Sequence, residues 1–163
     1  MAVVLVGAGA TAALRWHPQA AARRPAAARL PVVGYRLEGA GRAPVAVRLE
    51  VAADPRSRQL GLAGRGQVAP GTGMVFLFPG DTRAAFWMKD TRVPLAIAFV
   101  RADGRVVGLA EMAPCLADPC RLYTAPAPYR YAVELGAGGF RAAGVRVGDR
   151  VVPADPADLP TAE

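Results

Sequence analysis

The chain has 163 residues, enough for one domain with flanking segments, and its hydrophobic fraction of 53% is enough for a real core. Its 18 glycines and 15 prolines argue against long helices and favour a turn-rich β protein. The net charge of +7 suggests nucleic-acid binding, but the arginines are scattered and form no dense patch interleaved with aromatic residues. We therefore expect a solvated basic surface rather than a nucleic-acid partner.

Residues 1–14 are predicted to be a signal-like or anchoring segment. Their apolar run has the length of a signal-peptide core and is too short to span a bilayer, which takes roughly 20 apolar residues. No Lys or Arg precedes this run. Residues 15–31 form an Ala/Arg/Pro tract without periodicity, which predicts a flexible linker. The arrangement predicts an extracytoplasmic protein that is secreted or tethered to a membrane through its N-terminus.

A dinucleotide-binding fingerprint is imitated by the letters GAGATA at residues 7–12. That motif needs a helix after the glycines and an acidic residue roughly 20 positions further on. Pro18 would end any such helix early, and the first acidic residue, Glu38, lies too far along the chain. We therefore expect no nucleotide and no other cofactor.

The folded part is predicted to span residues 32–153 as a mainly β domain, a compact antiparallel sandwich or barrel with one or two short helices. Alternating apolar and polar residues predict strands at 45–51 and 129–135. Asp54-Pro55 is typical of a helix N-terminus with Pro at its first position, and it predicts a short helix that ends at Leu60.

Turn residues divide the rest of this region. Asp103-Gly104 predicts a tight hairpin turn, and Pro79-Gly80 is expected to stop the apolar strand at residues 74–78. Further strands are predicted at residues 84–88, 95–100, 106–110 and 150–152, with a Gly-rich loop at 61–73, a helical turn at 140–143 and a disordered tail at 154–163.

The chain has two cysteines, Cys115 and Cys120, separated by four residues that include an Asp-Pro turn. This spacing can bring two Cα atoms within disulfide reach. A zinc site would need two more ligands, and the only histidine, His17, lies in the predicted linker, so we expect no metal. The pair predicts a structural disulfide that stabilises the fold by roughly 2 kcal/mol. Two reduced thiols remain the alternative.

The segment FWMKDTRVPL, residues 86–95, holds the only lysine of the chain, Lys89, among many arginines. An ammonium is a compact point charge, whereas a guanidinium is a planar fork, so a position that keeps Lys where Arg otherwise prevails suggests a tight pairing. Strand alternation would put Trp87 and Lys89 on one face, where an aromatic ring beside a cation can hold a sugar or an anionic ligand. Alternatively, Lys89 pairs with Glu134 or Asp149 while Trp87 packs over the core.

Short motifs occur along the chain at residues 58–65, 73–78, 86–91, 93–95, 131–135, 137–138 and 144–149. In this order they resemble a prokaryotic family catalogued as domain of unknown function 192, DUF192. The resemblance covers about residues 45–152, and its most specific part is the Trp-Met-Lys block. It implies a compact, mostly β domain that is often exported and has no established activity. The family commonly has Asn where this chain has Asp90, an acid where it has Ala96, and Met where it has Ala63.

Nucleophilic triads are almost excluded by the residues available, because Ser57 is the only serine and His17 the only imidazole base. Paired-carboxylate chemistry would need two acids at one site, and each candidate acid also has a structural explanation. Glu134 would lie on the polar face of a strand, Asp149 in a Gly-Asp turn, and Asp90 would cap a loop. Glu111 is a further acid of this kind.

The function predicted from the sequence is therefore an accessory module that binds a small ligand or a cell-envelope partner. The alternative is a hydrolase or lyase that uses Lys89 with Asp90 or Glu134 in a surface groove. The candidate binding residues are Trp87, Lys89, Asp90, Thr91, Arg58, Arg65, Glu134 and Asp149.

Overall fold

The computed structural model describes residues 29–158 and 161–163. The predicted signal-like segment and most of the predicted linker lie outside these residues. Within the described part, no helix has the length and apolarity needed to cross a membrane. The strands are β1 (Val32–Glu38), β2 (Val45–Ala52), β3 (Thr72–Thr82), β4 (Phe86–Trp87), β5 (Leu95–Val100), β6 (Val106–Met112), β7 (Leu122–Tyr123), β8 (Tyr129–Gly136) and β9 (Arg150–Pro153); the helices are α1 (Pro55–Leu60), α2 (Gly139–Ala142) and the 3-10 turn η1 (Pro156–Asp158).

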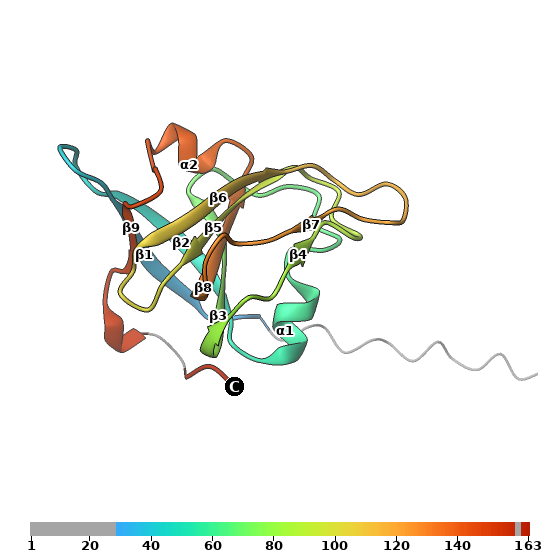
Figure 1. Cartoon of the computed structure of the whole chain (residues 1–163), viewed down its shortest axis with the longest axis horizontal. Helices are drawn as coiled ribbons and strands as arrows, with labels where there is room; N and C mark the ends of the chain where they lie inside the picture. The colour runs from blue at the N-terminus through green and yellow to red at the C-terminus, as the bar shows by residue number, and fades with distance from the viewer. Residues whose placement is uncertain (1–28, 159–160) are drawn as a thin grey trace, which may run out of the picture.

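In the described part of the chain, seven strands form one curled sheet in the order β6-β5-β8-β3-β2-β1-β9, and β4 and β7 form a separate ribbon. The mainly β prediction with short helices is thus confirmed. Figure 1 shows α1 and α2 at opposite ends of the sheet, with the β4–β7 ribbon beside it. The pair β2 and β3 is parallel, whereas the other strand pairs are antiparallel. A parallel pair needs a crossover, and residues 53–71, which include α1, supply it.

The two edges of the sheet approach each other near the hairpin between β5 and β6. The amide of Val106 donates to the carbonyl of Asp149 over 2.8 Å, and the amide of Val151 donates to the carbonyl of Gly104 over 2.9 Å. Gly104 has a φ of +87°, which a residue with a side chain rarely adopts, so the predicted Asp-Gly turn is confirmed. These bonds hold the sheet in a half-barrel.

The sheet carries an apolar cluster on each face. The inner cluster includes Tyr35, Leu49 and Val133, and the outer cluster includes Phe76, Ile97 and Tyr129. All six residues of β5 are buried as a consequence. Strands β5 and β8 therefore have no solvated face, although alternation along β8 suggested one.

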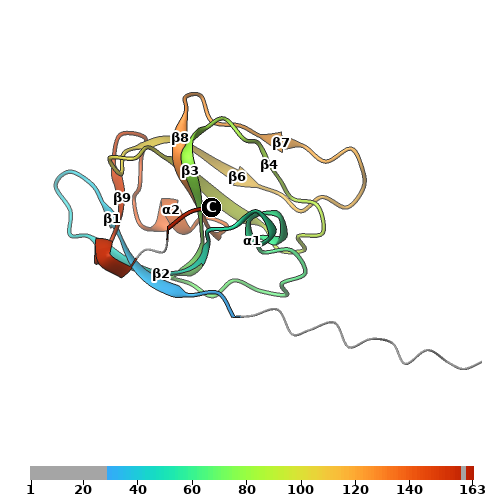
Figure 2. The same cartoon turned by 90° about the horizontal axis from the view of Figure 1, so that it is seen from below.

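Helix α1 forms as predicted. Asp54 accepts a hydrogen bond from the amide of Ser57, and the Ser57 hydroxyl accepts one from the amide of Asp54, so the two residues make a reciprocal capping box on either side of Pro55. Glu163 lies beside this helix, where the chain end is marked in Figure 2, and its amide donates to the carbonyl of Ala53 over 2.8 Å. The described residues of the predicted tail, 154–158 and 161–163, thus include contacts to the domain.

Several strand boundaries differ from the prediction, most of them by one or two residues. Strand β3 does not stop at Pro79-Gly80 but continues to Thr82, because the ladder to β8 is irregular between Leu77 and Thr82 and proline is tolerated where no ladder bond is required. The strand predicted at 84–88 is the two-residue β4. Strands β1 and β7 were not predicted from the pattern.

Candidate functional site

A groove lies where α1 and the turn after it face the segment that leads into β4. We call it the α1–β4 groove. It has a volume of about 310 Å³. Its lining includes five of the candidate residues, Arg58, Trp87, Lys89, Thr91 and Glu134. Apolar residues complete its wall, among them Leu60 and Leu62 from the crossover and Phe76 and Phe78 from β3.

Trp87 stands at this groove with its ring accessible. The residue is 53% exposed and pairs across the ribbon with Leu122, which is 59% exposed. The Lys89 ammonium lies 6.0 Å from the centroid of the Trp87 ring. Strand β4 ends at Trp87, so strand alternation does not explain this proximity. Lys89 is placed instead by a single β-bridge to Cys115.

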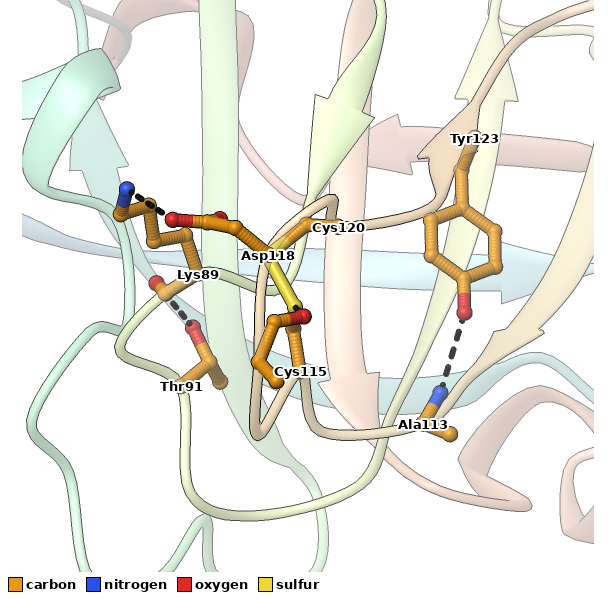
Figure 3. The surroundings of a disulfide bond; sticks show 8 residues. Lys89, Thr91, Ala113, Cys115, Asp118, Cys120 and Tyr123 are labelled. Carbon is orange, nitrogen blue, oxygen red and sulfur yellow. Dashed lines mark hydrogen bonds and ion pairs between the residues drawn. A yellow bond between two sulfur atoms is a disulfide. The ribbon is translucent and has the colours of Figure 1, made fainter.

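The partner of Lys89 is Asp118, and neither Glu134 nor Asp149 takes that place. The Lys89 ammonium lies 3.0 Å from the Asp118 carboxylate, and both side chains are largely exposed. Asp118 lies between Cys115 and Cys120, which form the predicted disulfide with their Cα atoms 5.6 Å apart. Figure 3 shows the ammonium pointing at the carboxylate beside this bond. The disulfide loop thus supplies the counter-charge of the only lysine.

Glu134 was predicted on a polar face but is buried, with 4% of its surface exposed. Its neighbours across the sheet are apolar, Met74 on β3 and Ile97 on β5. Among the described residues, its side chain has no hydrogen-bond or ion-pair partner, and desolvation raises the pKa of the carboxyl to about 8. At pH 7 this group is therefore mostly a neutral carboxylic acid at the groove.

Arg58 lines the groove, but its guanidinium is engaged by main-chain carbonyls. It donates to Ala53 over 2.7 Å, to Leu77 over 2.8 Å and to Glu163 over 2.6 Å. The same group lies 5.2 Å from the centroid of the Phe78 ring. Arg58 therefore ties the crossover, β3 and the chain end together, which fixes one wall of the groove.

Thr91 is buried and lines the groove close to Lys89. Its hydroxyl lies 3.5 Å from the carbonyl oxygen of Lys89, at the limit of a hydrogen bond. The amide of Thr91 donates to the carbonyl of Met88 over 3.1 Å, closing a turn around Lys89. Asp90, within this turn, has a φ of +58°, and its carbonyl accepts from the amide of Gly64. The Asp90 side chain is not part of the groove lining.

Two further candidates lie outside the groove. Arg65 makes a two-pronged ion pair with Glu50, at 2.7 and 2.6 Å. Asp149 accepts from the amide of Arg146 and pairs with Arg42 at 2.8 Å, and these contacts hold its pKa below the ordinary value. Both arrangements join parts of the domain, which accounts for these residues without a ligand.

Sequence reasoning missed Asp118 as the partner of Lys89, although its place between two cysteines marks it as part of a constrained loop. Of the described residues, Cys115, Asp118 and Cys120 form the one group with ligand atoms close enough to hold a metal ion. Their two sulfur atoms are bonded to each other, so they offer no thiolate. We assign no metal to this loop.

The family and structural comparisons agree with this architecture. Residues 36–153 match the model of DUF192, described as "Uncharacterized ACR". The crystal structure of a Sinorhizobium meliloti 1021 protein, described as a "putative transcription regulator", superimposes with a TM-score of 0.73 and 31% sequence identity. The match covers 80% of this chain and 98% of the Sinorhizobium chain. A Novosphingobium aromaticivorans DSM 12444 protein of unknown function is 28% identical with a TM-score of 0.68, covering 83% and 89% respectively. No curated protein matches. The chain is a member of the DUF192 family.

Proposed function

We propose that the domain is an extracytoplasmic accessory module that binds a small polar ligand of the cell envelope in the α1–β4 groove and does not catalyse a reaction. The observation that carries this proposal is Trp87, which is 53% exposed at the groove. A tryptophan that serves only to hold a core is buried, whereas a ligand platform faces a groove. Lys89 beside the ring adds a charged donor that suits a sugar or an anion.

The extracytoplasmic part of the proposal is supported by the disulfide and by the apolar N-terminal sequence. Its test is a fusion of residues 1–31 to an alkaline phosphatase that is active only after export. We expect phosphatase activity in intact cells of a bacterial host. A fusion that accumulates inactive in the cytoplasm would contradict export and leave the groove to be tested separately.

The binding part is tested by following the Trp87 indole N–H in NMR spectra during titration with a set of neutral, acidic and basic small molecules. We expect at least one class to shift this signal and Trp87→Ala to abolish its binding, measured by calorimetry. Val147→Ala is the control, because Val147 is also an exposed apolar residue, at 62%, and does not line the groove. Unchanged spectra with every class would contradict the proposal.

The second candidate is a hydrolase or lyase, favoured by one observation. Glu134 is a buried carboxyl at a groove with a pKa raised to about 8, as general acids often have. Asp90 does not line the groove, so Glu134 is its one carboxyl in the described part of the chain. Turnover of an ester or glycoside that Glu134→Gln abolishes would replace the binding proposal with this one.

The description of the Sinorhizobium protein also raises DNA binding. Four arginines of the described region are paired with acids, which reduces the basic surface available to phosphates; they are Arg36, Arg42, Arg65 and Arg130. We therefore do not extend that description to this chain.

A further inference from the structure

Resting on the proposed binding role of the α1–β4 groove, we propose that its ligand is an uncharged, hydroxyl-rich molecule of the carbohydrate class, and that the Glu134 carboxyl hydrogen-bonds to one of its hydroxyls. The proposal starts from the position of Glu134. The residue is only 4% exposed, yet it lines the groove. A buried polar group normally has a partner, so this carboxyl is available for a group that the ligand brings.

The carboxyl oxygens of Glu134 are not fully sealed from solvent. Among the described residues, no side-chain oxygen is both sealed from solvent and without a hydrogen-bond partner. Glu134 has no such partner in the described part of the chain, so neither of its oxygens is sealed. Because Glu134 also lines the groove, a hydroxyl of a ligand bound there would take the place of solvent at the carboxyl.

The charges around Glu134 decide which ligand it suits. Its strand neighbours Met74 and Ile97 are apolar. The two cations that line the groove, Arg58 and Lys89, are held by main-chain carbonyls and by Asp118. With no cation beside it, the carboxyl keeps its proton to a pKa of about 8 because of desolvation. A neutral carboxylic acid both donates and accepts a hydrogen bond, as a hydroxyl does.

A charged ligand fits this lining less well. A cationic ligand would have to enter beside Arg58 and Lys89, which repel it. An anionic ligand would lose its water at the apolar floor, where Glu134 carries no positive charge and the Arg58 guanidinium is already bound to three carbonyls. An uncharged ligand meets neither cost.

The mouth of the groove has the features that a sugar requires. Trp87 offers an aromatic face on which the C–H face of a sugar ring can stack. The ammonium of Lys89 is largely exposed at 6.0 Å from the centroid of that ring, and it supplies a donor for hydroxyls. Stacking at the mouth and one buried hydrogen bond at the floor would together orient a sugar unit.

The experiment is calorimetric titration and NMR of the Trp87 indole with four probes: cellotriose, chitotriose, trigalacturonate and putrescine. We expect a neutral trisaccharide to bind with an affinity that is constant below pH 7 and falls above pH 8. Above pH 8 the free protein has lost the Glu134 proton, so binding must first return that proton to the carboxyl. Glu134→Gln, which keeps a donor and an acceptor, should bind within threefold of the wild type at pH 7 and lose the pH dependence. Glu134→Ala should bind at least tenfold more weakly.

Glu50→Gln is the matched control, because Glu50 pairs with Arg65 outside the groove and its change should leave the affinity unaltered. Binding of putrescine or trigalacturonate alone would overturn the ligand class while supporting the groove as a binding site. Tight trisaccharide binding by Glu134→Ala would overturn the role of Glu134. An indole signal that no probe shifts would count against both the ligand class and the proposed function.

Discussion

The Lys89 ammonium and the Asp118 carboxylate are 3.0 Å apart, so the only lysine of the chain is paired with a residue enclosed by the disulfide. Both side chains are largely exposed, at 46% and 67%. Exposed ion pairs contribute about 0–1 kcal/mol to stability. The pairing therefore positions the ammonium near Trp87 more than it stabilises the fold.

Lys89→Arg should accordingly change the free energy of unfolding by less than about 0.5 kcal/mol, because the pair is exposed and the substitution keeps the charge. Urea denaturation followed by circular dichroism measures this. A loss of more than about 2 kcal/mol would mean that the ammonium has a structural role that a guanidinium cannot fill.

Glu134→Gln should change how stability depends on pH. The carboxyl has its ordinary pKa near 4.5 in the unfolded chain and about 8 in the folded protein, so folding takes up a proton between these values. The free energy of unfolding of the wild type therefore falls as the pH rises from 4.5 to 8, by up to about 5 kcal/mol for this group. Glu134→Gln should lack this decline. Urea denaturation at pH 5 and pH 9 measures the free energy of unfolding of the wild type and of Glu134→Gln. An equal change between the two pH values in both proteins would contradict the burial of an unpaired carboxyl.

Replacing both cysteines by serine should lower the free energy of unfolding by roughly 2 kcal/mol, since the closed loop is short. It should also free Asp118 from its place beside Lys89, because no bond between residues 115 and 120 then constrains the loop that carries Asp118. Denaturant midpoints with and without reductant measure the first effect in the wild type. If reductant leaves the wild-type midpoint unchanged while thiol labelling shows full reduction, the disulfide has no structural contribution.

Arg58→Lys should destabilise the domain by about 2 kcal/mol, because a lysine keeps the charge but cannot donate to three carbonyls from one planar group. Thermal unfolding measures the loss. Arg56→Lys is the control on the same helix, since no side-chain contact is described for the exposed Arg56. Equal melting temperatures for the two variants would show that the guanidinium contacts do not hold the crossover.

Local chemistry explains which features could be predicted from the sequence. The start of α1 needs only Asp54 as its N-cap and Pro55 at its first position, and the hairpin turn needs only Asp103-Gly104. The disulfide joins residues five positions apart. In each case the interacting groups are close in the sequence, so their types and spacing predict the contact.

Glu134 could not be placed in this way, because its environment is assembled from distant segments. Alternation in β8 is the same whether the second face is solvated or covered. The cover comes from the outer cluster, to which the crossover contributes Leu62 and a later segment contributes Met88. The partner of Lys89 likewise depends on how the disulfide loop approaches the turn after β4, which the bridge between Lys89 and Cys115 records.

The parallel pairing of β2 with β3 constrains how this site can vary among related chains. The connection between two parallel neighbours has to leave the plane of the sheet and return, and here that excursion is itself one wall of the groove. Insertions and deletions in residues 53–71 would therefore widen or narrow the groove while every strand keeps its register. The volume of the groove can thus diverge through the length of this one connection, with no change to the sheet.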